Sequence, residues 1–317
     1  MNDPGGLAEI ADSSLYRITR RIASGGMGAV YEARQLGVEG FEKTVAVKTI
    51  VRGYADDPEV RRLFIGEAKL VADLVHENIV QVYHLGATEG RYYLVMEYVD
   101  GVNLAQFTRR HKELDLLPPV ELGAFIISRI CRGLEYAHAK RGHDGHELGI
   151  VHRDVSPKNV LINFEGVVKM ADFGIAKARR HMEQKDDVMM GKFEYMSPEQ
   201  TRGEITDRRS DLFSLGIVMY ELLLGRPLFQ APTPRHVIEK VQRLPIPSPG
   251  EVREDLPPAL ASIVMRALER DPSRRFGTAG EMGHALEHYM YHDRFGPTNV
   301  TLGEYMKEHF RPEQDGA

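Results

Sequence analysis

Apolar and polar positions follow different periods in different parts of the chain. A β-branched run predicts a strand on which Ala46, Lys48 and Ile50 share one face. Residues 58–75 instead carry apolar side chains at helical spacing, at Val60, Leu63, Phe64, Leu70, Val71 and Leu74. The patterning therefore predicts a strand-rich region over residues 16–96 that contains one main helix.

From residue 102 onward the apolar positions recur mostly at helical spacing. Two short strands are expected to interrupt the helices, at residues 160–163 and 167–170. The longest apolar stretch, residues 212–224, is too short to cross a bilayer and contains Glu221, so we expect no membrane-spanning helix. Cys131, the single cysteine, lies in a helical apolar pattern and is expected in the core rather than in a redox site.

Composition limits the classes of function. The length of 317 residues suggests one or two domains. The net charge of −5 lacks the basic excess of a nucleic-acid or membrane-surface binder, so we expect neither partner. Residues 1–14 have neither a basic start nor an apolar run, so no secretory signal is expected and we predict a cytoplasmic protein.

The chemically most informative side chains flank the two short strands. Asp154 and Asn159 precede them, and Asp172 follows them at the start of an Asp-Phe-Gly sequence. A nucleoside triphosphate held through magnesium needs a carboxylate and an amide oxygen for the metal, and a second carboxylate to orient the attacking hydroxyl. This spacing supplies all three groups and predicts phosphoryl transfer.

Two further parts of a nucleotide site lie in the strand-rich region. A glycine-rich turn, whose backbone N–H groups can approach phosphate oxygens, is formed by Ala23, Ser24, Gly25, Gly26, Met27 and Gly28. Glu67 falls inside the apolar stripe of the predicted helix, which is costly for a carboxylate unless it meets a cation. We predict that Glu67 pairs with Lys48 and holds this lysine in place to bind phosphate. The alternative is a buried ion pair without that role.

These motifs resemble those of the bacterial eukaryotic-like Ser/Thr protein kinases, and the resemblance covers about residues 16–290. Ser197-Pro198-Glu199 stands where the family has Ala-Pro-Glu, Asp211 lies in the following helical pattern, and Arg275 is placed to pair with Glu199. The wording of the motifs is most similar to that of myxobacterial kinases. The resemblance implies an α+β, two-lobed kinase fold with a β-rich N-lobe and a mostly helical C-lobe.

The resemblance also implies domain limits and cofactors. It places a lead-in at residues 1–15, the N-lobe at 16–96, a hinge at 97–101, the C-lobe at 102–290 and a tail at 291–317. It implies ATP and Mg²⁺, with Mn²⁺ as an alternative metal, and protein substrates; self-association is left open.

Roles follow for individual residues in the same way. Asp154 would accept the substrate proton, Asn159 and Asp172 would hold the metal, and Lys48 would hold the α- and β-phosphates. Besides the glycine-rich turn, the adenine would meet Val30, Ala46, Met96, Glu97, Val99 and Leu161, with Met96 as gatekeeper. In the family, the arginine next to the catalytic aspartate usually pairs with a phosphate on the activation segment, and here this position is Arg153. No Ser, Thr or Tyr lies between Gly174 and Tyr195, so we expect a fixed carboxylate there instead.

Three positions depart from the family pattern. Ala23 replaces the first glycine of the turn, Ser156 replaces a lysine of the catalytic loop, and Lys192 stands where a threonine is usual. Lys192 could return the missing cation to the transferring phosphate, or it could point to solvent. The changes blur the markers that separate Ser/Thr from Tyr kinases, and Pro157 favours Ser/Thr.

Two other classes remain as alternatives, a kinase-fold binding module with little activity and a small-molecule phosphotransferase of related fold. The complete catalytic set argues against the first, and the Glu199, Asp211 and Arg275 framework argues against the second. The histidines around residue 146 are expected in a solvated loop rather than a metal site. In the tail, a capping box is predicted to begin a short helix at Thr301, which either docks on the C-lobe or binds a partner.

Overall fold

The computed structural model describes residues 15–25, 28–50, 62, 65–66, 68–69, 71–88, 91–142, 144–173, 193–292 and 295–311. These residues belong to two compact units. The first contains the described residues up to 76 together with residues 80–99, and the second contains residues 77–79 and the described residues from 100 onward.

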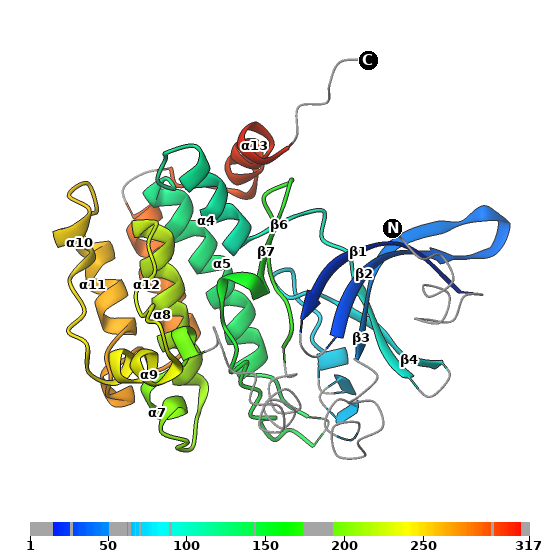
Figure 1. Cartoon of the computed structure of the whole chain (residues 1–317), viewed down its shortest axis with the longest axis horizontal. Coiled ribbons are helices and arrows are strands. Elements are labelled where there is room, and N and C mark those ends of the chain that lie inside the picture. The colour runs from blue at the N-terminus through cyan, green and yellow to red at the C-terminus, as the bar shows by residue number, and fades with distance from the viewer. Residues whose placement is uncertain are drawn as a thin grey trace. The chain divides into compact units, whose positions relative to one another are not determined.

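The first unit is built on an antiparallel sheet of five strands in the order β1-β2-β3-β5-β4 (Figure 1). The strands are β1 (Tyr16–Gly25), β2 (Gly28–Leu36), β3 (Glu42–Ile50), β4 (Val82–Thr88) and β5 (Arg91–Glu97), with a 3-10 turn η1 (Val38–Gly40) between β2 and β3. The described residues between 62 and 72 are helical.

The two faces of this sheet are distinguished by the two-residue period of its strands. Val45 and Val47 of β3 are fully buried and belong to one apolar cluster with Tyr93 and Val95 of β5. The opposite face carries Leu94, which packs with Ala68 of the helical segment. Because Lys48 lies directly opposite Leu94 across the ladder, its side chain belongs to the face on which this helix packs.

The second unit combines a small sheet with helices. Its strands, in the order β6-β7-β8, are β6 (Gly101–Asn103), β7 (Val160–Asn163) and β8 (Val168–Met170). Its helices are α4 (Leu104–Glu113), α5 (Val120–His138), α7 (Pro198–Thr201), α8 (Arg208–Leu224), α9 (Pro234–Arg243), α10 (Pro249–Val252), α11 (Pro258–Ala267), α12 (Ala279–Tyr291) and α13 (Asn299–Phe310). Three 3-10 turns, η2 (Pro157–Asn159), η3 (Phe193–Tyr195) and η4 (Pro272–Arg274), complete it.

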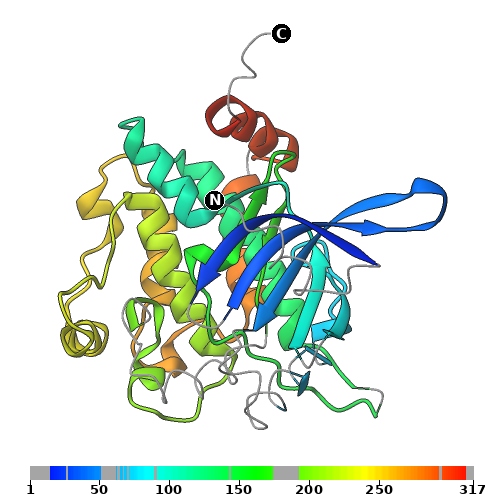
Figure 2. The same ribbon diagram turned by 45° about the vertical axis from the view of Figure 1, so that its right-hand side comes forward.

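Helix α8 is the core of the second unit, in contact with α5, α11 and α12 (Figures 1 and 2). Every residue from Ser210 to Leu224 is buried, as expected for a helix that is apolar on all sides. Asp207 caps its N-terminus by accepting the N–H of Arg209, and Gly225 ends it in the left-handed conformation at φ 65°. This helix provides the rigid support for the loops described below.

The observed architecture confirms the predicted fold, a strand-rich part with one helical segment followed by a mostly helical part. Cys131 is fully buried on α5, as predicted, and burial raises the pKa of its thiol. Within the described part of the chain, no helix combines the length and apolar character that crossing a bilayer requires.

The prediction for the start of the C-terminal helix is wrong by one turn. Helix α13 begins at Asn299, and its N-cap is Thr298 rather than Thr301. Thr301 N–H donates to the Thr298 hydroxyl at 3.2 Å, so Thr301 is the third residue of the helix and not its N-cap. Glu304, three residues after Thr301, gives that threonine the sequence signature of a capping box, but the chain uses Thr298 as the cap.

Candidate active site

The residues before η2 form a loop that is fixed from below by one buried carboxylate. Asp211 on α8 accepts the backbone N–H of His152 at 2.8 Å and that of Arg153 at 2.7 Å. It also accepts Nε2–H of His138, at the end of α5, at 2.8 Å. Although complete burial opposes ionisation, the hydrogen bond and charge of His138 lower the pKa of Asp211 below its usual range.

Asp154 and Asn159 are brought together within this loop. Asn159 Nδ2 donates to the carboxylate and to the backbone carbonyl of Asp154, both at 2.8 Å. Because this Asn159 atom lies next to two oxygen acceptors, it is the amide nitrogen, and Oδ1 is left as the atom that can bind a cation. The Ala171 N–H donates to the Asn159 carbonyl at 2.8 Å, and this bond connects the loop to the residue preceding Asp172.

His152 links the same two segments from the other side. Its Nε2 lies 3.0 Å from the Ala171 carbonyl and its Nδ1 accepts the Asp154 N–H at 3.2 Å, an arrangement that requires the Nε2–H tautomer. The ring of Phe173 packs edge-on against it, with centroids 4.5 Å apart. The Asp-Phe-Gly segment is therefore anchored to the catalytic loop through Ala171, the residue that precedes it, and through Phe173.

Two residues of this region have unusual backbone conformations. Arg153 and Asp172 both have φ of 62°, a left-handed conformation that is unfavourable for side chains other than glycine. Such strain persists only where surrounding contacts impose it, and it is typical of functional sites. At Arg153 the imposing contacts are the hydrogen bonds that the His152 and Arg153 N–H groups donate to the Asp211 carboxylate.

The residues predicted for phosphate and adenine binding in the first unit lie on neighbouring strands. The register pairs Val30 with Lys48 and Ala46 with Met96, so these four side chains share one face of the sheet. Met96 and Ala46 are buried, and Glu97, at the end of β5, bonds through its backbone N–H to the Gln81 carbonyl at 2.8 Å. The turn between β1 and β2 pairs Ala23 with Val30 and Ser24 with Ala29.

Several predicted site residues lie outside the described residues, and their roles stay predictions. They are Gly26, Met27, Glu67, Gly174 and Lys192, together with the carboxylates expected to pair with Arg153. In the second unit, Leu161 is half-buried on β7 and Ser156 precedes η2. The loop residue His146 is exposed, as a solvated loop predicts.

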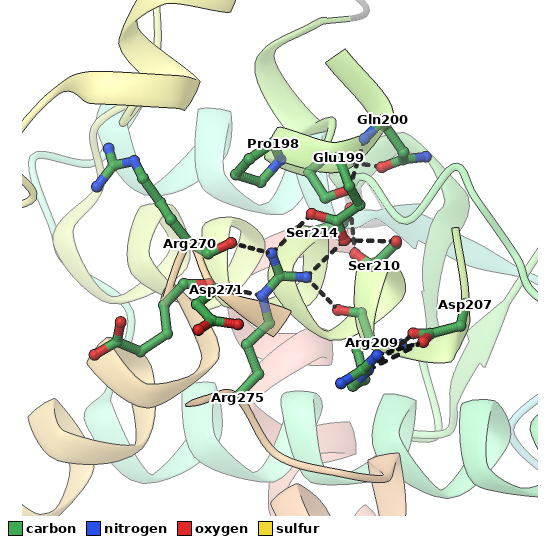
Figure 3. Close-up of polar contacts among 12 residues, drawn as sticks. Pro198, Glu199, Gln200, Asp207, Arg209, Ser210, Ser214, Arg270, Asp271 and Arg275 are labelled. Carbon is green, nitrogen blue, oxygen red and sulfur yellow. Dashed lines mark hydrogen bonds and ion pairs between the residues drawn. The ribbon is translucent and has the colours of Figure 1, made fainter. Parts of the chain in front are cut away.

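Glu199 and Arg275 form the predicted pair (Figure 3). Two guanidinium nitrogens of Arg275 reach the two carboxylate oxygens at 2.7 and 2.8 Å, and Ser210 donates to the same carboxylate at 2.7 Å. Burial opposes ionisation, but the Arg275 and Ser210 hydrogen bonds outweigh it and lower the pKa of Glu199 to about 2. Next to Glu199, Gln200 donates to the Arg153 carbonyl at 3.1 Å, so α7 also supports the catalytic loop.

Sequence reasoning missed three polar residues that the fold places beside these elements. The sequence marks Glu221 only as a charge within an apolar stretch and assigns no role to His138 or Gln200. Glu221 is in fact buried on α8, where it accepts the Tyr195 hydroxyl at 2.7 Å and the Leu228 N–H at 2.9 Å. A charge within an otherwise apolar helix was the available signal.

Comparison with known proteins agrees with this geometry. The family described as "Protein kinase domain" matches residues 16–290. Tyrosine-protein kinase MasK of Myxococcus xanthus is 36% identical over 94% of this chain and 46% of its own length. Serine/threonine-protein kinase PrkC of Bacillus subtilis is 34% identical over 92% of this chain and 43% of its own length. The kinase domain of Mycobacterium tuberculosis PknI superposes with a TM-score of 0.66 at 28% identity, over 89% of this chain and 98% of that one.

The chain belongs to the protein kinase family, and these relatives identify it as a bacterial, eukaryotic-like member. It spans less than half of the length of the curated relatives that it matches, at 46% for MasK and 43% for PrkC. The similarity to a Myxococcus kinase agrees with the resemblance in motif wording.

Proposed function

We propose that this kinase domain transfers the γ-phosphoryl group of ATP to Ser or Thr hydroxyls of protein substrates. The observation that carries the proposal is the catalytic loop, in which the Asn159 amide is bonded to the Asp154 carboxylate at 2.8 Å and the backbone is held by Asp211. A carboxylate fixed in this way is suited to orient a substrate hydroxyl and accept its proton. Since ATP is the proposed co-substrate, we also propose a cytoplasmic location.

The donor set fits a hard cation such as Mg²⁺. Carboxylate and amide oxygens are the ligands that Mg²⁺ prefers, and we propose Asp172 and Asn159 Oδ1 for this role. When bound, the metal would neutralise charge on the β- and γ-phosphates. The Asn159 side chain is oriented for this by its two bonds to Asp154.

For the nucleotide, we propose that Lys48 meets the α- and β-phosphates while Val30, Ala46 and Leu161 contact the adenine. The glycine-rich turn would contribute backbone N–H groups, and Glu67 would hold Lys48. Hinge contacts to adenine are proposed for the backbone of Glu97 and Val99. Lys192 is proposed to supply the positive charge that Ser156 cannot provide. Lys192→Ala tests this proposal and is expected to lower turnover.

The relatives differ in the acceptor residue that their names state. MasK is named a tyrosine kinase, whereas PrkC is named a serine/threonine kinase. We propose Ser/Thr because Pro157 follows the pattern of Ser/Thr catalytic loops. Phosphoamino-acid analysis of a generic protein substrate is expected to show phosphoserine or phosphothreonine, and phosphotyrosine alone would overturn this choice.

The central experiment is the substitution Asp154→Asn, which keeps the shape of the side chain and removes its basicity. Turnover is expected to fall by about 10²-fold or more while ATP binding survives, because the residue acts on the acceptor hydroxyl. Asp115→Asn is the matched control, since Asp115 is exposed and its φ of 52° is tolerated by asparagine. Equal turnover in both variants would refute the assignment.

A further inference from the structure

Helix α13 lies beyond residues 16–290, the part of the chain that matches the kinase family. It nevertheless packs closely on the rest of the second unit, where its Leu302 and Met306 side chains are fully buried. In Figures 1 and 2 it lies next to the turn that connects β7 and β8. This turn is of interest because β7 follows Asn159 directly and β8 ends two residues before Asp172.

The contact between α13 and the β7–β8 turn is made by backbone against backbone. A Cβ added to Gly166, in the turn, would lie 2.0 Å from the Asn299 carbonyl and 2.5 Å from the Gly303 nitrogen. A Cβ added to Gly303, on the helix, would lie 2.8 Å from the carbonyl of Glu165. No other residue type fits between the two segments without movement, so the helix and the turn are in mutual contact at two glycines.

The C-terminal half of α13 is held by α4. The Tyr305 hydroxyl bonds to Nε2 of the buried His111 at 2.7 Å, and Phe310 stacks on Phe107 with centroids 4.9 Å apart and planes within 8°. The Arg110 Nε–H donates to the His309 carbonyl at 3.1 Å. Helix α4 also contacts η2, which ends in Asn159. Helix α13 is therefore connected to the catalytic loop both through the β7–β8 turn and through α4.

We propose that α13 positions the metal-holding side chains Asn159 and Asp172 by fixing the β7–β8 turn against α4. Gly303 and Tyr305 are then positioning residues. The proposal rests on the proposed function for the identity of the metal-holding residues. The physical basis is that outer contacts which orient metal ligands affect metal affinity even though they never touch the metal.

Gly303→Ala is the decisive variant. Alanine is a better helix former than glycine, so α13 itself should not be weakened, while the added methyl must push against the backbone of Glu165. Glu304→Ala is the matched control, because it makes a substitution to the same residue at the adjacent, exposed position. Tyr305→Phe is a second variant that loosens the α4 side and adds no volume at the turn.

Two measurements on the full chain separate positioning from general stability. Hydrogen exchange without nucleotide measures the protection of the Met170 and Ala171 amides, which donate to the carbonyls of Asn78 and Asn159, respectively. Titration of ATP with and without Mg²⁺ reports how much the metal tightens nucleotide binding. Gly303→Ala is expected to speed exchange at these amides and to reduce the Mg²⁺-dependent tightening by roughly threefold to tenfold, while the protection of the α8 amides is unchanged. Tyr305→Phe should change both in the same direction by less.

The proposal is overturned if Gly303→Ala behaves as Glu304→Ala does in either measurement. A general loss of protection across α8 would also overturn it, since that outcome indicates destabilisation of the whole unit. Failure of the proposed function is distinguishable, because the wild-type chain would then show no Mg²⁺-dependent ATP binding or transfer, while the exchange comparison would still report on the contact.

Discussion

Two buried glutamates of the second unit, Glu199 on α7 and Glu221 on α8, have pKa values that are shifted in opposite directions. Their residues are 5% and 8% exposed, so burial is similar. The pKa of Glu199 is lowered to about 2, and burial raises the pKa of Glu221 to about 7. The difference lies in the hydrogen-bond partners among the described residues. Glu199 accepts from the guanidinium of Arg275, whereas Glu221 accepts from two neutral donors, the Tyr195 hydroxyl and the Leu228 N–H.

The comparison shows that hydrogen bonds from neutral donors do not by themselves offset the desolvation of a buried carboxylate. The two residues consequently have opposite effects on the pH dependence of stability. Glu199 contributes stability above its ordinary pKa of 4.5 that is lost as the pH falls through about 2. Glu221 favours the folded state most below 4.5, and this contribution is lost as the pH rises through about 7.

Removing the cation from the Glu199 pair should have the largest effect. Arg275→Ala leaves a buried carboxylate without its counter-charge and is expected to cost about 3–5 kcal/mol of unfolding free energy at pH 7. Arg274→Ala is the matched control, because Arg274 is 68% exposed and its pair with Glu269 at 3.1 Å is a surface ion pair worth less than about 1 kcal/mol. Urea unfolding measures both, and equal costs would contradict the comparison.

Making Glu221 permanently neutral should change the pH dependence of stability. From pH 5 to pH 8, the unfolding free energy of Glu221→Gln is expected to rise relative to that of the wild type by roughly 2–3 kcal/mol. The reason is that only the wild type must ionise a buried group at position 221 over this range. Urea unfolding at the two pH values tests this expectation. The exposed Glu254→Gln serves as control, and parallel curves for wild type and Glu221→Gln would show that Glu221 is not neutral below pH 7.

The smallest effect is expected from the tyrosine. Tyr195→Phe removes the hydroxyl that donates to Glu221 at 2.7 Å and should cost about 1 kcal/mol, more at pH 8 than at pH 5, since a hydrogen bond to an ionised acceptor is stronger. Tyr83→Phe on the exposed part of β4 is the control. An equal cost at both pH values would indicate that the ionisation of Glu221 does not change across this range.

Local patterning accounts for the parts of the site that were predicted correctly. The two-residue period of β3 predicted that Lys48 and Ala46 share a face, and the register with β5 confirms it. The spacing around Asp154 and Asn159 predicted a common loop because few residues separate them. Resemblance to the kinase family, rather than any local rule, predicted the Glu199–Arg275 pair, since the two residues are far apart in the chain.

The sequence by itself determined the fold class, the strand that carries Lys48, and the short segment that holds Asp154, Asn159 and Asp172. These features depend on periods and spacings within one or two neighbouring elements. Only the tertiary structure decided that His138 and Asp211 meet, that α13 rests on Gly166, and that burial raises the pKa of Glu221 while Arg275 lowers that of Glu199. Each of these depends on desolvation and on partners brought together from distant parts of the chain, which no local pattern specifies.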